Sequence, residues 1–147
     1  MPSRAASATE LPATLATPAE PMLVLDSGGL SRLASRTRRT AALIEAFRRH
    51  GLWPPVVPTV VIAESTTGKA RTDTNINRLL KACDNDPNVS EHTARRAGQL
   101  RAAARRGSAV DAIVVGIAEP GSTVLTTDPD DLNAFASHAD GVAIETL

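Results

Sequence analysis

The sequence predicts an α/β fold in which helices surround a mostly parallel central sheet. Short apolar runs typical of buried parallel strands recur along the chain, and segments with helical periodicity separate them. This alternation favours a parallel sheet, because a crossover helix must carry the chain back before the next parallel strand begins. With 147 residues, the chain is long enough for one such domain and too short for two of ordinary size.

The first half of the chain holds two predicted strands. Residues 22–26, MLVLD, are an apolar run that ends in an acid, and Val56-Val57 follows a rigid Trp-Pro-Pro segment. Helices are expected in four segments: about Gly29–Ala34, Arg38–His50, a helix that opens at Pro58-Thr59 and contains Glu64, and about Asp73–Ala82.

The second half is predicted to end the sheet. Residues 83–88, CDNDPN, are expected to form a loop, TVLT at 123–126 a strand, and VAIET at 142–146 an edge strand. Three helices are expected: one capped by Ser90 and running to about Arg106, one beginning at Ser108 after Gly107, and a short one after Asp128-Pro129.

The N-terminal residues 1–21 are rich in Ala, Pro, Thr and Ser and lack the apolar block of a secretory signal. We expect them to be a disordered extension of one domain, residues 22–147, although Met22 could also be the natural start. The single cysteine, Cys83, excludes an internal disulfide and suits a reducing, cytoplasmic location. No apolar stretch approaches the roughly 18 residues of a membrane span, so no membrane association is expected.

The charges are segregated although the formal net charge is zero. All 16 Lys and Arg residues lie at or before Arg106, 14 of them are Arg, and the tail that follows carries only acids. The basic runs are either solvated helix faces or a surface for a polyanion or an acidic partner, and both interpretations remain open.

Four acids stand next to predicted core segments in four separate elements: Asp26, Glu64, Asp111 and Asp128. Asp26 and Asp128 each follow a predicted strand, and ligands of open parallel sheets bind at the carboxyl ends of strands. Each acid also has a structural alternative. Asp26 could be an N-cap or a turn residue, and Asp128 could cap a helix. Asp111 could complete a capping box with Ser108, and Glu64 could pair with an arginine.

One convergent cluster explains all four positions, whereas the structural alternatives need a separate reason for each. Clustered carboxylates raise one another's pKa and stay ionised together only beside a cation. Oxygen ligands without Cys or His favour Mg²⁺ or Mn²⁺, which support phosphodiester cleavage. A glycosidase site is disfavoured, because the chain has only two Phe, one Trp and no Tyr to form a sugar platform.

The ordered set LDSGGL, TVVIAES, SAVDAIVVGIA and VLTTDPDDL resembles the acidic positions of the PIN domain, and of small VapC-type toxins in particular. The resemblance runs from Met22 to about Leu147. It implies a PIN-like three-layer sandwich and a Mg²⁺-dependent endoribonuclease toxin, which cleaves cellular RNA by metal-activated water. It also implies neutralisation by a cognate VapB-type antitoxin, and a homodimer.

The resemblance assigns roles to residues that match the family's motif. Asp26, Glu64, Asp111 and Asp128 match the metal-binding acids, and Mn²⁺ could replace Mg²⁺. Thr126 matches a hydroxyl residue two before the last acid, Asp131 a further acid, and Ser27 the small polar residue after the first acid. The Gly28-Gly29 pair departs from the pattern and predicts a pliable turn. We expect RNA contacts from Arg32, Arg36, Arg38 and Arg39, which could instead form an antitoxin or dimer surface.

Two other classes of enzyme that gather acids at strand ends fit the sequence less well than a nuclease. A receiver domain needs a late Lys, and none follows Lys81, while a haloacid-type phosphatase needs Asp-x-Asp where this chain has Asp26-Ser27-Gly28. The alternative that is not an enzyme is a catalytically inactive PIN-like scaffold that binds RNA or a protein. Retention of all four acids argues against it.

Overall fold

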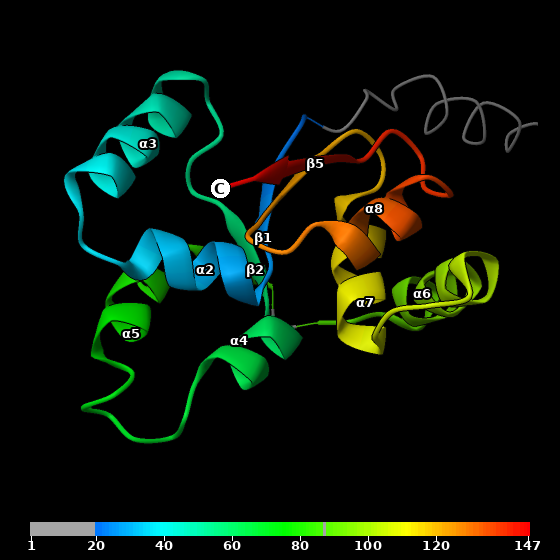
Figure 1. Cartoon of the computed structure of the whole chain (residues 1–147), viewed down its shortest axis with the longest axis horizontal. Coiled ribbons are helices and arrows are strands. Elements are labelled where there is room, and N and C mark those ends of the chain that lie inside the picture. The colour runs from blue at the N-terminus through cyan, green and yellow to red at the C-terminus, as the bar shows by residue number, and fades with distance from the viewer. Residues whose placement is uncertain (1–19, 87) are drawn as a thin grey trace, which may run out of the picture.

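The computed structural model describes residues 20–86 and 88–147, in which five parallel strands form one sheet (Figure 1). The order across the sheet is β3-β2-β1-β4-β5. The strands are β1 (Leu23–Leu25), β2 (Val56–Pro58), β3 (Asp84–Asp86), β4 (Thr123–Thr126) and β5 (Ala143–Thr146). The expected extension, residues 1–21, lies outside the described residues except for Glu20 and Pro21, and stays a prediction.

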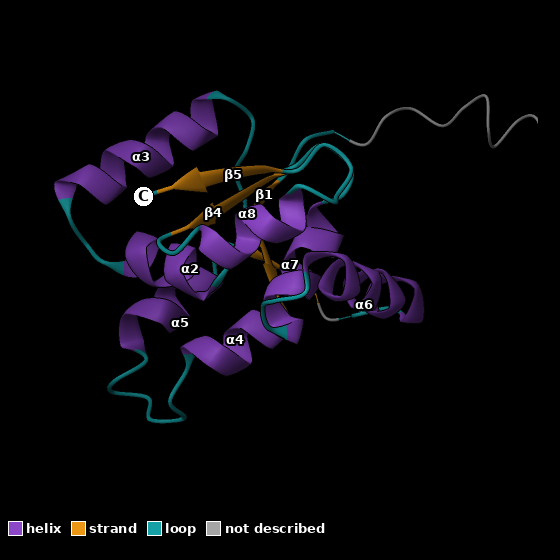
Figure 2. Cartoon of the chain, turned by 45° about the vertical axis from the view of Figure 1, so that its right-hand side comes forward, coloured by secondary structure: helices purple, strands orange, loops and turns teal. Residues whose placement is uncertain are grey.

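Helices cover both faces of the sheet (Figure 2). The helices are α2 (Ser27–Ala34), α3 (Arg38–Arg49), α4 (Thr59–Ser65), α5 (Thr74–Leu80), α6 (Glu91–Ala104), α7 (Ala109–Ala118) and α8 (Asp130–Ala136). Within this set α2 contacts α3, α4 and α5, while α7 contacts α6 and α8; both α2 and α7 contact β1 and β4. Because crossovers between parallel strands are right-handed, the two groups cover opposite faces. The three-layer α/β arrangement expected from the sequence is confirmed.

The core lies where the two helical layers meet the central strands. All three residues of β1 are buried, as are Val124 and Leu125 of β4, because helices cover both sides of these strands. Phe135 of α8 is fully buried and closes the core on the side of α7. Within the described part, no helix is long and apolar enough to cross a membrane.

Several elements differ from the sequence-based expectation: α2 begins at Ser27 rather than Gly29, and α5 ends at Leu80 rather than Ala82. Residues 84–86 form strand β3 instead of a loop: the segment has no apolar residue, yet it pairs with β2 at the edge of the sheet. The long helix α6 ends at Ala104 rather than Arg106, because Arg105 takes the left-handed conformation (φ 58°). The last strand, β5, pairs only with β4 and is the edge strand expected.

Candidate active site

The four predicted acids lie around the point where the order of the strands changes direction, between β1 and β4. The chain steps outward from β1 to β2 and β3, then returns to place β4 on the other side of β1. The crevice at the carboxyl ends of two such strands is the usual ligand site of an open parallel sheet. Asp26 directly follows β1, and Asp128 lies two residues beyond β4. The sequence therefore places one acid on each side of this switch point.

Asp26 is buried, with 6 % of its surface exposed, and its two oxygens have different partners. Oδ1 accepts a 2.7 Å hydrogen bond from the Gly29 N–H and so caps helix α2, while Oδ2 accepts a 2.5 Å bond from the Thr126 hydroxyl. Burial raises the pKa of Asp26, and the charge of Asp128 adds to the rise, while the two hydrogen bonds oppose it. The helix-capping role considered for Asp26 is confirmed. Its raised pKa means that the ionised carboxylate is nevertheless less favourable here than in water.

Thr126 connects the two sides of the switch point. Its fully buried hydroxyl donates to Asp26 and accepts a 3.0 Å hydrogen bond from the backbone N–H of Asp128. The residue therefore fixes the Asp26 carboxylate relative to the loop that carries Asp128. This geometry gives Thr126 a positioning role in the site.

The two glycines after Asp26 form a close packing contact rather than a pliable turn. Both lie in the first turn of α2, which Ser27 opens. A Cβ atom on Gly29 would overlap the Leu125 carbonyl oxygen, and one on Gly28 would overlap the Thr127 side chain. Glycine is thus needed for α2 to begin against the end of β4, which holds Asp26 at the switch point.

Asp111 lies in the first turn of α7, which runs antiparallel to the strands and so begins at the same edge as the other acids. The Ser108 hydroxyl accepts a 3.1 Å hydrogen bond from the Asp111 N–H, as expected for an N-cap. Burial raises the pKa of Asp111, and the charges of Asp26, Glu64 and Asp131 raise it further. Asp26, Glu64 and Asp131, which come from three other segments, are therefore within electrostatic reach of Asp111.

Glu64 and Asp128 lack the structural roles considered for them. Neither side chain has an ion pair or a hydrogen bond with any described residue. The alternative in which Asp128 caps α8 is wrong, because the helix begins at Asp130 and Pro129 occupies the cap position. Two exposed carboxylates at this edge thus remain available to a ligand.

Asp131, the further acid of the resemblance, has a partner that the sequence did not reveal. Its Oδ1 accepts a 2.7 Å hydrogen bond from Nε of Arg106, which lies 25 residues earlier in the chain. In the sequence, Arg106 is only the last member of a basic run with Arg95, Arg96, Arg101 and Arg105, because no local pattern signals a contact over this separation. One oxygen of Asp131 is therefore committed to a cation of the protein.

The four arginines expected to contact RNA fall into two pairs. Arg32 and Arg39 line a cavity of about 390 Å³ together with Leu147, whose N–H bonds the Thr126 carbonyl oxygen at 2.9 Å. Arg36 and Arg38 instead line a cavity of about 420 Å³ at the turn between α2 and α3. The first cavity reaches Leu147, next to Thr126, whereas the second lies at the turn between α2 and α3, and none of the four acids lines either cavity.

The chemistry of the acids at this edge fits a hard divalent ion, because they offer only carboxylate oxygens and their negative charges repel one another. Among the described residues, no three acids, cysteines or histidines lie close enough together to hold an ion directly. Mg²⁺ commonly retains several waters and takes one or two protein carboxylates, so a direct set of three is not required. Asp26, Glu64, Asp111 and Asp128 are the residues that would hold it, directly or through water.

No protein-family model and no curated protein sequence matches the chain. Solved structures do match it. VapBC2 from Rickettsia felis, solved with a promoter DNA fragment, superimposes with a TM-score of 0.64 at 13 % identity, over 86 % of this chain and 98 % of the other.

Two further structures match with a TM-score of 0.56. PAE2754 from Pyrobaculum aerophilum is 14 % identical, over 84 % of this chain and 90 % of the other. FitAcB from Neisseria gonorrhoeae is 19 % identical, over 84 % of this chain and 96 % of the other. At these identities the likeness concerns the fold. The PIN-like α/β fold predicted from the sequence is confirmed.

Proposed function

We propose that this protein is a Mg²⁺-dependent endoribonuclease and the toxin of a toxin–antitoxin pair. The observation that carries the proposal is the meeting of acids from separate elements at the switch point of the sheet, where the charges of Asp26, Glu64 and Asp131 add to the effect of burial in raising the pKa of Asp111. Burial and neighbouring acids raise the pKa of Asp26 and Asp111 there, and among the described residues only Arg106, beside Asp131, forms an ion pair with an acid of this group. Such an arrangement costs stability, which a bound divalent ion would recover.

The residues of the site have separable tasks. A bound Mg²⁺ would make water more acidic and neutralise charge at phosphorus. Asp26 is buried and Asp111 is half-buried, and both would bind the ion at the carboxyl edge of the sheet. Glu64 and Asp128 are exposed and would approach it from α4 and from the loop after β4. Thr126 keeps Asp26 and the Asp128 backbone in register through its hydroxyl.

An RNA substrate is supported by the cations beside this edge. Arg32 and Arg39 flank the cavity that reaches Leu147, next to Thr126. The guanidinium group forms paired hydrogen bonds with phosphate oxygens and stacks on bases. Aromatic stacking platforms are absent from the composition, so recognition would depend on charge and shape.

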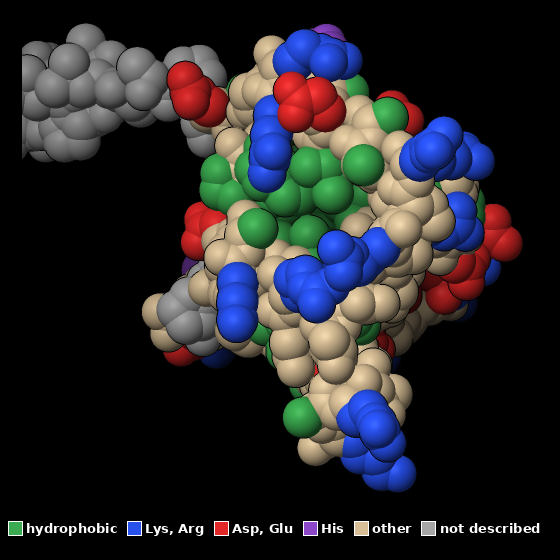
Figure 3. All heavy atoms as spheres, turned by 90° about the vertical axis from the view of Figure 1, so that its left-hand side faces the viewer, with side chains coloured by type: hydrophobic (Ala, Val, Ile, Leu, Met, Phe, Trp, Pro, Cys, Tyr) green, Lys and Arg blue, Asp and Glu red, His purple; other side chains and the backbone are tan. Residues whose placement is uncertain are grey.

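An antitoxin partner is supported by an apolar surface beside the same arginines. Leu43 and Phe47 of α3 face Leu125 and Leu147 across a cavity of about 300 Å³, which shares Leu43 and Leu147 with the arginine-lined cavity. The side of the molecule where α3 lies shows an apolar hollow with Lys and Arg side chains around it (Figure 3). An antitoxin segment with apolar anchors and acidic flanks fits this surface. Phe47→Glu should weaken antitoxin binding and leave the Mg²⁺ response of the free toxin unchanged.

RNA cleavage by antitoxin-free protein tests the main proposal. Unfractionated transfer and ribosomal RNA would be incubated with Mg²⁺, with Mn²⁺, and with chelator. Wild-type protein should cut discrete sites only with a divalent ion, and Glu64→Gln should cut at least about 100-fold more slowly. Glu45→Gln removes an exposed acid on α3 and should cut like wild type. Binding of RNA without cleavage under any of these conditions would favour the inactive scaffold.

A further inference from the structure

The corner between α6 and α7 is fixed against α8. Arg105 takes the left-handed conformation, and Gly107 has φ 89°, a region that favours glycine. A Cβ atom on Gly107 would overlap the ring of Phe135 in α8, so the backbone of the corner packs directly on that ring. Arg106, between these two residues, is therefore held at a defined place beside α8.

Arg106 uses only part of its guanidinium group. Nε donates to Oδ1 of Asp131 at 2.7 Å, and no other hydrogen bond joins Arg106 to a described residue. The side chain of Arg106 is 53 % exposed and that of Asp131 is 39 % exposed. The two terminal nitrogens are therefore uncommitted within the described part of the chain and open to solvent.

This ion pair stands beside the acidic site. Asp111 and Asp131 lie in the first turns of α7 and α8, which pack against each other, and the charge of Asp131 acts on the Asp111 carboxylate. An exposed ion pair contributes little to stability, so stabilisation of the fold is a weak reason for it. A guanidinium held through Nε, with its terminal nitrogens free, is suited to a paired contact with a phosphate.

We propose that Arg106 contacts an RNA phosphate next to the acidic site and that Asp131 positions Arg106 instead of binding the ion. The inference rests on the proposed ribonuclease function. It assigns a substrate contact to a residue outside the predicted RNA-binding set. It also gives Asp131 a different task from the four acids.

RNA binding measures the role of Arg106 separately from cleavage. Fluorescence anisotropy with labelled transfer RNA, in Ca²⁺ and at several salt concentrations, would compare wild type with Arg106→Ala, Arg106→Lys and Asp131→Asn. Arg106→Ala should weaken binding about tenfold and lower the slope of log affinity against log salt by about 0.7 to 0.9. Arg106→Lys should recover the slope and only part of the affinity, because it keeps the charge and loses the fork.

Arg101→Ala is the matched control, since Arg101 lies in the last turn of α6, just before the corner, and has no ion pair with a described residue. It should change the affinity less than twofold. Asp131→Asn should weaken RNA binding while the rise of melting temperature with Mg²⁺ stays as in wild type. Melting curves without metal establish that each variant is folded.

Two results would overturn the inference. Either Arg106→Ala binds RNA with wild-type affinity and salt slope, or Asp131→Asn loses the Mg²⁺-dependent rise in melting temperature. If wild type cuts RNA in either case, only the role of Arg106 and Asp131 is rejected. If wild type neither binds nor cuts RNA, the proposed function fails with it.

Discussion

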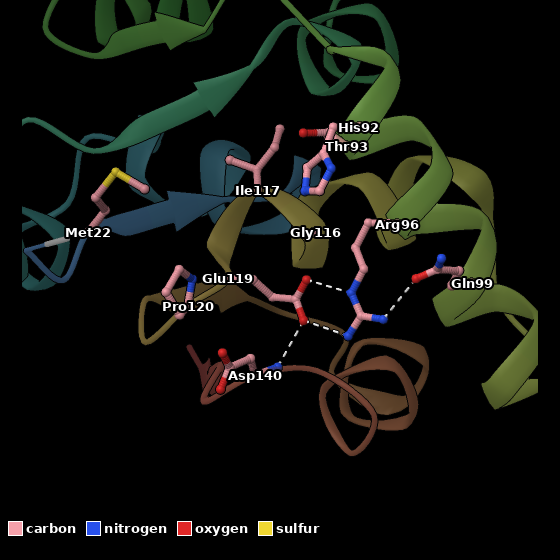
Figure 4. A pocket seen from close by; sticks show the side chains of 10 residues that line it. All are labelled: Met22, His92, Thr93, Arg96, Gln99, Gly116, Ile117, Glu119, Pro120 and Asp140. Atoms are coloured by element: carbon pink, nitrogen blue, oxygen red, sulfur yellow. Dashed lines mark hydrogen bonds and ion pairs between the residues drawn. The ribbon is translucent and has the colours of Figure 1, made fainter. Parts of the chain in front are cut away.

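Acids at the two ends of the sheet are treated differently by the fold. At the amino ends of the strands, Glu119 follows α7 and its carboxylate is held by both Nε and Nη2 of Arg96 at 2.8 Å and by the Asp140 N–H at 2.8 Å. Figure 4 shows this group beside a cavity of about 720 Å³. The hydrogen bond and charge of Arg96 lower the pKa of Glu119. At the carboxyl ends, burial and neighbouring acids instead raise the pKa of Asp26 and Asp111.

The difference separates structural acids from acids available to a ligand. Glu119 is satisfied by partners from α6 and from the α8–β5 connection, so it needs nothing beyond the protein. Glu64 and Asp128 have no partner among the described residues, and Asp26 is bonded only to neutral donors. The pairing of each carboxylate, rather than its mere presence, therefore indicates which end of the sheet carries function.

The largest expected effect is on cleavage. Asp26→Asn keeps a side-chain oxygen to cap α2 and removes the charge, so RNA cleavage should fall by more than the roughly 10–100-fold that loss of an outer-shell partner costs. Glu119→Gln at the opposite end should leave the cleavage rate of folded protein unchanged. Initial rates at saturating Mg²⁺ measure both. Equal losses of cleavage rate in the two variants would mean that acids at the two ends of the sheet do not differ in their contribution to cleavage.

A smaller loss is expected when the support of Asp26 is removed. Thr126→Val preserves volume and deletes the hydroxyl that bonds Asp26 and the Asp128 N–H. Cleavage should fall about 10–100-fold, as for residues that orient metal ligands. Thr126→Ser retains the hydroxyl and should recover most of the rate. A Val variant as active as Ser would show that the hydroxyl does not position the acids.

At the amino ends of the strands, a substitution should change the stability of the protein instead of its cleavage rate. Arg96→Ala leaves the Glu119 carboxylate, whose side chain is 13 % exposed, without its cation. We expect a loss of about 2 kcal/mol, reduced from the fully buried case because the Arg96 side chain is 31 % exposed. Urea unfolding at pH 7 measures it. Since the lowered pKa of Glu119 stabilises the fold above its ordinary value of 4.5, this loss should shrink as the pH falls below 4.5.

The smallest effect has the opposite sign. Because the pKa of Asp111 is raised above 3.8, its ionisation costs stability increasingly as the pH rises from 3.8 through the raised value. Asp111→Asn should therefore stabilise the metal-free protein at pH 7 by about 1 kcal/mol or less, and the gain should vanish near pH 3. Urea unfolding in chelator at the two pH values measures it. Destabilisation at pH 7 would leave Asp111 with a capping role alone.

The strands and acids that the sequence could predict are those marked by a local pattern of apolar residues. The run LVL and the central Val-Leu of TVLT are apolar and buried, so β1, β4 and the acids that follow them could be predicted. Strand β3 could not, because Asp84–Asp86 becomes a strand only through pairing with β2. The partners of Glu119 and Asp131 lie 23 and 25 residues away, and no local periodicity reports contacts between helices. The sequence thus predicts where the acids lie better than which of them are paired.

Mg²⁺ binding tests most directly whether the acids at the carboxyl ends share a cation. Melting temperatures would be recorded against Mg²⁺ concentration for wild type, Glu64→Gln and Glu119→Gln, without RNA. An ion that binds the folded state should raise the melting temperature of wild type and Glu119→Gln alike, and most of this rise should be lost in Glu64→Gln. The same Mg²⁺ response in Glu64→Gln as in wild type, or none in any of the three proteins, would contradict a shared metal site.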